Sequence, residues 1–222
     1  MAQQFLRARS PDQKAQRREA ILAAAGRLLE AQDADKVTLA AIATEAGVVK
    51  SAIYRYFPSR EAILIEILLA DIHAATTAGE AELNAIDAGA GSARVDAVAA
   101  VFARAFAQRP RLCFLVSVLA SVLENNLSWA DIVAFKSTLL EETGRAVLAL
   151  HQALPELAEG AGERAAFHMH VLVAGLWPFS NPTPIAAQVM ERPEFAQFRK
   201  DFETTLRDGI ATHLRGLLAE SS

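Results

Sequence analysis

The first sixty residues carry apolar positions at the spacing of an α-helix, and they predict three helices and the start of a fourth. The first covers 12–31, with Pro11 near its first turn, where a missing amide hydrogen is tolerated. Its apolar residues gather on one face: Ile21, Leu22, Ala25, Leu28 and Leu29. The polar stretch QDADK that follows predicts a loop.

Two short helices joined at a glycine are predicted next. Thr38 is a good N-cap for a helix over 39–46, whose apolar residues fall at i, i+3, i+4 and i+7. Gly47 ends this helix, because glycine tolerates the left-handed conformation of a C-terminal cap. The second short helix begins three residues later and turns Ile53 and Phe57 inward. This arrangement is a helix-turn-helix.

The rest of the chain also has helical periodicity, so the predicted fold class is all-α. Pro58 stops the second short helix, and Ser59 caps a long one. Helices are predicted over 60–83, 94–108, 110–125, 128–154, 162–177 and 193–218, with loops at 87–92 and 155–163. No residue from 165 to 190 is formally charged, but histidines and prolines interrupt the apolar run. We therefore expect a buried helix and then a loop there, rather than a membrane span.

Charge is unevenly distributed along the chain. Residues 7–60 contain ten Lys and Arg against six Asp and Glu, a net +4, whereas residues 61–222 contain twelve against twenty, a net −8. A basic front on an acidic body favours an N-terminal part that faces a polyanion. The single cysteine, Cys113, rules out an intrachain disulfide, and its apolar neighbours favour a buried structural thiol over a nucleophile.

A basic and aromatic cluster lies on the second short helix. With the apolar pair turned inward, its outward residues are Lys50, Ser51, Ala52, Tyr54 and Arg55. Lysine and arginine can bond phosphates or guanine edges, tyrosine hydroxyls can bond phosphates, and alanine can contact a thymine methyl. A solvated amphipathic face would explain the charges, but not exposed tyrosines beside a helix-turn-helix corner. The cluster therefore predicts a DNA-contacting surface.

The stretch VTLAAIATEAGVVKSAIYRYFPSREAIL resembles the signature of TetR-type bacterial repressors, and the similarity extends roughly over 15–67. The resemblance implies an all-helical, Ω-shaped homodimer in the cytoplasm that binds a palindromic double-stranded DNA operator and is released by a small-molecule effector. It implies a flexible arm over 1–11, a DNA-binding domain over 12–61, and an effector-binding and dimerisation domain over 62–222. No cofactor and no membrane partner are expected.

The resemblance also adds Thr38, Tyr56 and Arg60 to the expected DNA contacts, with Arg60 on a phosphate. Val49 and Ala52 depart from the family pattern, because the family commonly has hydroxyl side chains at these two places. We therefore expect base reading to depend mainly on Lys50, Tyr54 and Arg55.

The resemblance places the effector pocket among the middle helices. The candidate lining residues are Phe102, Phe106, Phe114, Asn125, Asn126, Trp129, His168 and Trp177. Each aromatic has plain core packing as its alternative, and the two asparagines could simply end a helix. We expect a mostly apolar effector with one polar group.

The last two helices are the family's dimer interface. In the final helix an apolar stripe has polar neighbours: Phe202, Leu206, Ile210, Leu214 and Leu217. Ala174 and Gly175 would allow a close approach of helices. The alternative is that these helices form a bundle within one chain.

Two other function classes have less support. A small helical enzyme would use Cys113, His168 or His170, but the sequence contains no Ser-His-Asp pattern, nucleophile elbow or phosphate loop. No catalytic residue is therefore named. A metal site lacks ligands at suitable spacing, because His168 and His170 lie on different helix faces. An adaptor protein whose helix-turn-helix is purely structural stays open.

Overall fold

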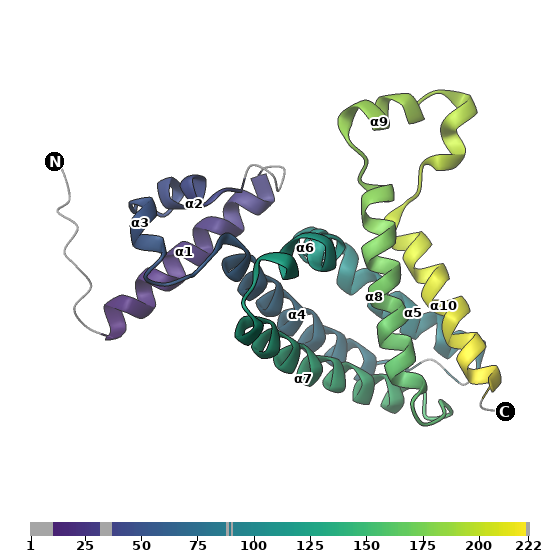
Figure 1. The fold of residues 1–222 in the computed structure, drawn as a ribbon. Coiled ribbons are helices and arrows are strands. Elements are labelled where there is room, and N and C mark those ends of the chain that lie inside the picture. Colours follow the sequence, from purple (N-terminus) through teal and green to yellow (C-terminus); the bar gives the residue numbers. More distant parts are fainter. Residues whose placement is uncertain (1–10, 32–36, 88, 90, 221–222) are drawn as a thin grey trace.

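The structure is a computed structural model, and it describes residues 11–31, 37–87, 89 and 91–220. Every element in these ranges is helical (Figure 1). The α-helices are α1 (Pro11–Ala31), α2 (Leu39–Glu45), α3 (Lys50–Ile53), α4 (Arg60–Asn84), α5 (Ser92–Ala107), α6 (Pro110–Val118), α7 (Trp129–Ala153), α8 (Ala161–Ser180), α9 (Pro184–Met190) and α10 (Phe202–Glu220). The expected all-α class is confirmed. The arm predicted over 1–11 lies, except for Pro11, outside the described residues.

The two ends of the chain form different parts of the molecule. Helices α1, α2 and α3 pack together and are joined to the rest through α4 (Figure 1). Helix α4 lies against α7 and also contacts α5 and α6, while α10 packs against α5 and α8. The N-terminal helices can therefore respond to the larger part chiefly through α4 and its neighbours.

Helix α4 is long and apolar enough to cross a membrane by length and composition alone, as is the bent pair of 92–107 and 110–126 if taken as one span. In the structure, apolar residues of α4 such as Ile63, Leu64 and Leu68 are buried in the hydrophobic core. A core helix passes the same test of composition, so this is weak evidence for a membrane span.

The C-terminal region departs from the expected helix boundaries. The helix predicted over 193–218 is wrong in its first third: a 3₁₀ turn covers Pro193–Phe198, and α10 starts only at Phe202. Asp201 accepts a hydrogen bond from the Thr204 amide at 2.8 Å and so caps the new helix. Helix α9 occupies part of the expected loop, because Thr183 caps it through the Ala186 amide at 3.4 Å.

Two further boundaries differ. Helix α8 continues through Pro178 to Ser180 instead of ending at residue 177. The helix predicted over 110–125 ends at Val118 and passes into a π-helical turn, Leu119–Leu123, and then a 3₁₀ turn, Glu124–Asn126. In π-helical and 3₁₀ turns, each backbone amide bonds a carbonyl one residue farther or nearer than in an α-helix. Apolar periodicity does not reveal so small a change.

Candidate nucleic-acid interface and effector cavity

The corner between α2 and α3 is built by local hydrogen bonds. The Thr38 hydroxyl accepts from the Ala41 amide at 3.2 Å and caps α2. At the other end Gly47 has φ of 64°, the Gly47 amide bonds the Thr44 carbonyl at 3.1 Å, and the Val48 amide bonds the Ala43 carbonyl at 2.9 Å. This pair of bonds is a Schellman motif, which needs a residue that adopts positive φ at little cost. Gly47 therefore sets the angle at which α3 leaves α2.

Helix α3 is anchored by its apolar face. Ile53 and Phe57 are fully buried, as the sequence predicted. The regular helix ends at Ile53, but the turn continues through the bonds of the Tyr56 and Phe57 amides to the Ile53 carbonyl at 2.8 and 3.0 Å. The rigid anchor leaves the opposite face free to meet another molecule.

The side chains predicted to contact DNA divide by exposure. Four of the outward residues on the α3 turn are exposed: Lys50, Ser51, Tyr54 and Arg55. The exposed fraction of Tyr54 is 55%. Ala52 and Tyr56 are half-buried, and Tyr56 packs against the core. Val49 is also exposed, directly before the helix. The exposed face of α3 thus carries two cations, Lys50 and Arg55, and the phenol of Tyr54, which are side chains that can contact DNA bases and phosphates in a major groove.

Arg18 contacts the buried side of this turn, and Arg60 follows the turn at the start of α4. Arg18 of α1 forms an ion pair with Glu66 of α4, and its guanidinium lies 4.8 Å from the centre of the Phe57 ring. Arg60 donates to the adjacent Glu61 at 3.0 Å and is only half exposed. A phosphate contact by Arg60 would therefore compete with the Glu61 carboxylate.

A cavity of about 160 Å³, partly open to solvent, lies among the middle helices. Its wall is mainly apolar and is contributed by α4, α5, α6, α7 and α8. The lining residues are Ile72, Ala75, Thr76, Gly79, Glu80, Leu83, Phe102, Ala105, Phe106, Leu112, Val116, Leu139, Glu142, Thr143, Ala146, Val147, Ala149, Leu150, Ala166, Met169 and His170. A concave apolar site with a few polar groups is the usual form of a small-molecule pocket.

Two of the eight candidate effector residues, Phe102 and Phe106, line this cavity. The amides of Asn125 and Asn126 donate instead to carbonyls four residues earlier, at 2.8 and 3.2 Å, which fits the alternative that they end a helix. Trp129 starts α7 and is 81% exposed. These three residues lie outside the cavity wall.

The other three candidates also lie elsewhere. Phe114 is half-buried and packs against the core. Trp177 meets the ring of Phe202 edge-on, with centroids 5.1 Å apart, as core packing predicts. His168 faces His213 of α10, with Nδ1 and Nε2 2.7 Å apart. It is His170, two residues later, that reaches the cavity.

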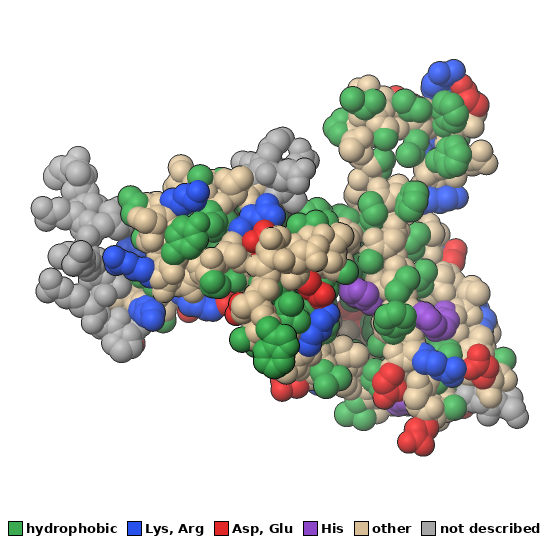
Figure 2. All heavy atoms as spheres, in the orientation of Figure 1, with side chains coloured by type: hydrophobic (Ala, Val, Ile, Leu, Met, Phe, Trp, Pro, Cys, Tyr) green, Lys and Arg blue, Asp and Glu red, His purple; other side chains and the backbone are tan. Residues whose placement is uncertain are grey.

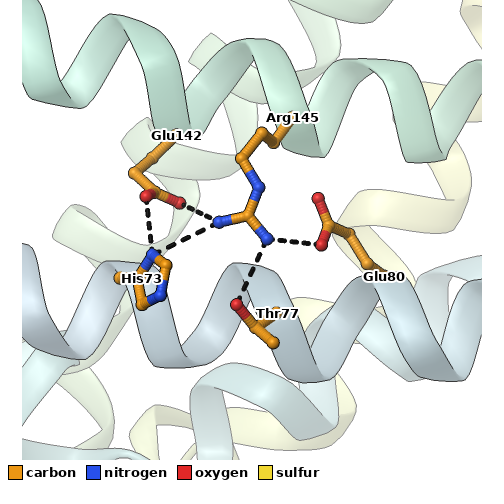
Figure 3. A network of polar contacts seen from close by, with 5 residues as sticks. All are labelled: His73, Thr77, Glu80, Glu142 and Arg145. Atoms are coloured by element: carbon orange, nitrogen blue, oxygen red, sulfur yellow. Dashed lines mark hydrogen bonds and ion pairs between the residues drawn. The ribbon is translucent and has the colours of Figure 1, made fainter.

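Two acidic residues of the cavity wall, Glu80 and Glu142, belong to a polar network between α4 and α7 that was not predicted from the sequence (Figure 3). Glu142 is buried, and its carboxylate lies 2.8 Å from His73 Nδ1 and 2.9 Å from Arg145. Arg145 also donates to Glu80 at 2.5 Å and to the Thr77 hydroxyl at 3.2 Å. Burial, with a smaller effect of Lys136, lowers the pKa of His170, so its imidazole is neutral at pH 7.

These acidic groups were not among the predicted lining residues, which were aromatic, amide and histidine side chains. Gly79 and Ala75 help to form the space by having little or no side chain, which leaves no distinctive pattern in a sequence. One available indication was the pair Glu142 and Arg145, three residues apart on a predicted helix with an apolar face.

Another arginine, Arg111, links the region of the cavity to the N-terminal helices. Arg111 of α6 binds both oxygens of Asp71 on α4, at 2.8 and 2.7 Å, and donates to Glu30 of α1 at 2.9 Å. A methyl group at Gly26 would lie 3.0 Å from the Arg111 guanidinium, so the glycine gives this side chain room. The next residue, Leu112, lines the cavity.

The packing of α8 and α10 differs from what the sequence predicted for these two helices. The apolar stripe of α10 is buried against α5 and α8 of the same chain, as the intrachain alternative predicts, so it does not indicate a dimer. Gly175 is exposed with no atom near its missing side chain, whereas a side chain at Gly162 would meet Val147 at 2.7 Å. The close approach of helices therefore occurs at Gly162. Phe167 and Val171 stay exposed beside a groove between α8 and α10.

Cys113 is fully buried, and its thiol donates to the Phe106 carbonyl at 3.3 Å. Burial raises the pKa of the thiol to about 12, so it is not an activated nucleophile. Within the described ranges, no group of three or more His, Cys, Asp or Glu could hold a metal ion.

Comparisons with known proteins agree with this architecture. Residues 21–67 match the family described as bacterial regulatory proteins, tetR family, and residues 69–221 match the tetracyclin repressor-like C-terminal domain. No protein of curated function matches the sequence significantly.

Solved structures share the fold over most of both chains. A protein from Mesorhizobium loti, assigned to TetR-family transcriptional regulators, superposes with a TM-score of 0.54 at 16% identity, covering 93% of this chain and 97% of its own. The TetR-family regulator PfmR from Thermus thermophilus gives 0.54 at 20% identity, covering 89% and 98%. The fatty acid degradation regulator FadR from Bacillus halodurans gives 0.51 at 13% identity, covering 87% and 97%. With both domain matches together spanning nearly the whole chain, the protein belongs to the TetR family of DNA-binding transcriptional regulators.

Proposed function

We propose that this regulator is a repressor that binds a palindromic operator as a homodimer, with α3 in the major groove. The observation that carries the proposal is the exposed face of α3, where Lys50, Tyr54 and Arg55 stand opposite the buried anchors Ile53 and Phe57. Lys50, Tyr54 and Arg55 would read bases, and Thr38, Ser51, Ala52, Tyr56 and Arg60 would add backbone or methyl contacts. The family is non-enzymatic, so an enzyme is no longer an alternative.

The proposed DNA-binding domain covers 12–61, and the effector-binding and dimerisation domain covers 62–222. Dimerisation would use the outer face of α8 and α10, where Phe167 and Val171 are exposed next to small residues such as Gly216. The projecting segment around α9 adds exposed apolar side chains beside this face (Figures 1 and 2). Apolar side chains of this kind are normally covered in the working assembly. We propose the cytoplasm as the place of action.

Effector release would follow from the connection between the cavity and α3. Six residues of α4 line the cavity, and α4 begins only a few residues after the α3 turn, past Pro58 and Ser59. Movement of α4 by a bound molecule would shift α3 and change the spacing between the two copies of α3 in the dimer. That spacing must be near 34 Å for successive major grooves.

The test is a selection from random double-stranded DNA with the purified protein, followed by a gel shift on the enriched sequence. We expect a palindrome bound with a Kd on the order of 10⁻⁸ M or tighter at moderate salt, with two chains per site. If no palindrome is enriched, the proposal is wrong. A purely structural helix-turn-helix would give that result.

A further inference from the structure

The charged groups on the cavity wall have one sign. Among the lining residues that the structure describes, the acidic side chains are Glu80 of α4 and Glu142 of α7, no Lys or Arg is present, and the remaining polar groups are two threonines and His170. The lowered pKa of His170 keeps it uncharged at neutral pH. The guanidinium of Arg145 and the imidazole of His73 belong to the network but are not part of the wall.

The network leaves these carboxylates under-compensated. Arg145 is shared, with one nitrogen on Glu142 at 2.9 Å and another on Glu80 at 2.5 Å. Two carboxylates thus have one guanidinium between them, and the other neighbour is the imidazole of His73. Glu142 is also largely withdrawn from water, with 11% of its side chain exposed. A carboxylate in such a place favours an approaching cation more strongly than one in bulk water does.

From the lipophilic wall and its paired carboxylates, we propose that the cavity binds a lipophilic cation, a short apolar chain or ring carrying an ammonium group directed at Glu80 and Glu142. The inference rests on the proposed effector-binding function of this cavity and names the chemical class of its ligand. The tail would contact Phe102, Phe106 and Leu150, and the ammonium would supply hydrogen-bond donors to carboxylate oxygens.

Other head groups fit the wall less well. A carboxylate head would face two like charges and could reach Arg145 only by taking it from Glu80 and Glu142. A hydroxyl head can donate a hydrogen bond but brings no charge. The volume of about 160 Å³ suits a small apolar body, since an apolar cavity of roughly 150 Å³ accepts benzene. An eight-carbon chain is a suitable probe, because its end can extend through the open side.

The test compares three ligands that share one tail: octylammonium, 1-octanol and octanoate, each titrated calorimetrically into the full-length protein at neutral pH. We expect octylammonium to bind about tenfold more tightly than octanol, because a hydrogen bond to a charged group adds about that factor. Octanoate should bind more weakly than octanol. Octanoate binding most tightly, equal affinity for all three, or no binding of octylammonium would each overturn the inference.

The matched variants are Glu142→Gln, Glu80→Gln and the control Glu82→Gln. All three remove one negative charge with nearly the same shape. Glu82 lies on α4 close to Glu80, but it pairs with Arg104 at 2.6 Å and is outside the cavity wall. We expect each of the first two changes to lower octylammonium affinity about tenfold and to leave octanol affinity unchanged, with Glu82→Gln like the parent. Unchanged octanol binding shows that the variant is folded, and equal losses in all three would contradict the assignment.

Operator binding separates this inference from the proposed function. The same preparations are tested by gel shift on the selected palindrome. Loss of the ligand preference with intact operator binding overturns the ligand class alone, and absence of operator binding overturns the function.

Discussion

At the scale of single residues, the side chains that hold α3 in place differ from the side chains that are proposed to contact DNA. Ile53 and Phe57 are buried, and Arg18 lies over the Phe57 ring while pairing with Glu66. Lys50 and Arg55 are exposed on the same turn. The helix is therefore stabilised from behind, and its outer residues can change without loss of fold.

The first prediction concerns which basic residues contact bases and which contact phosphates. Lys50→Ala and Arg55→Ala should each relax the base preference at one operator position by about 1–3 kcal/mol, because base-edge contacts carry sequence information. Arg60→Ala should weaken all sequences alike and flatten the salt slope by about one unit, as expected for a phosphate contact. Gel shifts on operator variants at several salt concentrations measure both effects. Equal, sequence-blind losses in all three variants would refute the division.

The second prediction concerns Cys113. Because burial raises the pKa of the thiol to about 12, the group stays protonated at pH 8 and is shielded from reagents. Alkylation at pH 8 should therefore be negligible in the folded protein and complete in denaturant, as measured by mass spectrometry. Rapid labelling of the native protein would contradict the buried position of Cys113 on α6, against the end of α5.

At the scale of elements, α8 and α10 use their two faces differently. The inner stripe of α10, from Phe202 to Leu217, completes the core of the protomer. The outer face keeps Phe167 and Val171 exposed, and between the helices runs a groove lined partly by glycine and threonine. One helix pair can thus serve the protomer core and a second copy at once.

The third prediction tests that outer face. The double variant with Phe167→Asp and Val171→Asp should raise the dissociation constant of the dimer by at least about 30-fold, because truncated or charged hot spots commonly cost about 2 kcal/mol or more. Light scattering over a dilution series measures it. Leu148→Asp is the matched control, since Leu148 is an apolar residue of α7 with 61% exposure, similar to the 64% of Phe167. A dimer unaffected by the double variant, or disrupted equally by the control, would place the interface elsewhere.

At the scale of the whole molecule, Arg111 connects the two parts. It joins α6 to α4 through Asp71 and to α1 through Glu30, and its neighbour Leu112 touches the cavity. The hydrogen bond that Arg111 donates to Asp71 raises the pKa of Arg111, against the opposing effect of burial, so the guanidinium stays charged at every working pH. A shift of α6 on ligand binding would therefore reach α1 directly.

The fourth prediction is that Arg111→Ala uncouples ligand from operator. In the parent protein, a stabilising ligand found by thermal shift should weaken operator binding roughly 5- to 150-fold, and by linkage operator should weaken the ligand by the same factor. In Arg111→Ala the factor should fall towards one. Arg104→Ala is the control, because Arg104 joins α5 to α4 through Glu82 and makes no contact of this kind with the described part of α1. Equal coupling in the two variants would rule out Arg111 as the link.

The sequence alone determined the helix-turn-helix, because its geometry depends on local chemistry. The cap at Thr38, the turn at Gly47 and the inward pair Ile53 and Phe57 act within a few residues of one another, and all were predicted. The all-α class followed from periodicity for the same reason. The late start of α10 was missed, since the competing cap at Asp201 resembles many other aspartates in a sequence.

The cavity was decided by the tertiary structure. Its wall combines residues from five helices, and its charge depends on Glu80 and Glu142 sharing Arg145 across α4 and α7. Only Phe102 and Phe106 among the eight candidates reach it. Apolar periodicity shows that a helix face is buried, but whether another side chain or an empty space lies opposite depends on packing between distant segments. The same limit applied to α10, whose stripe was predicted to face a partner chain, whereas the packing shows it buried in the core of its own chain.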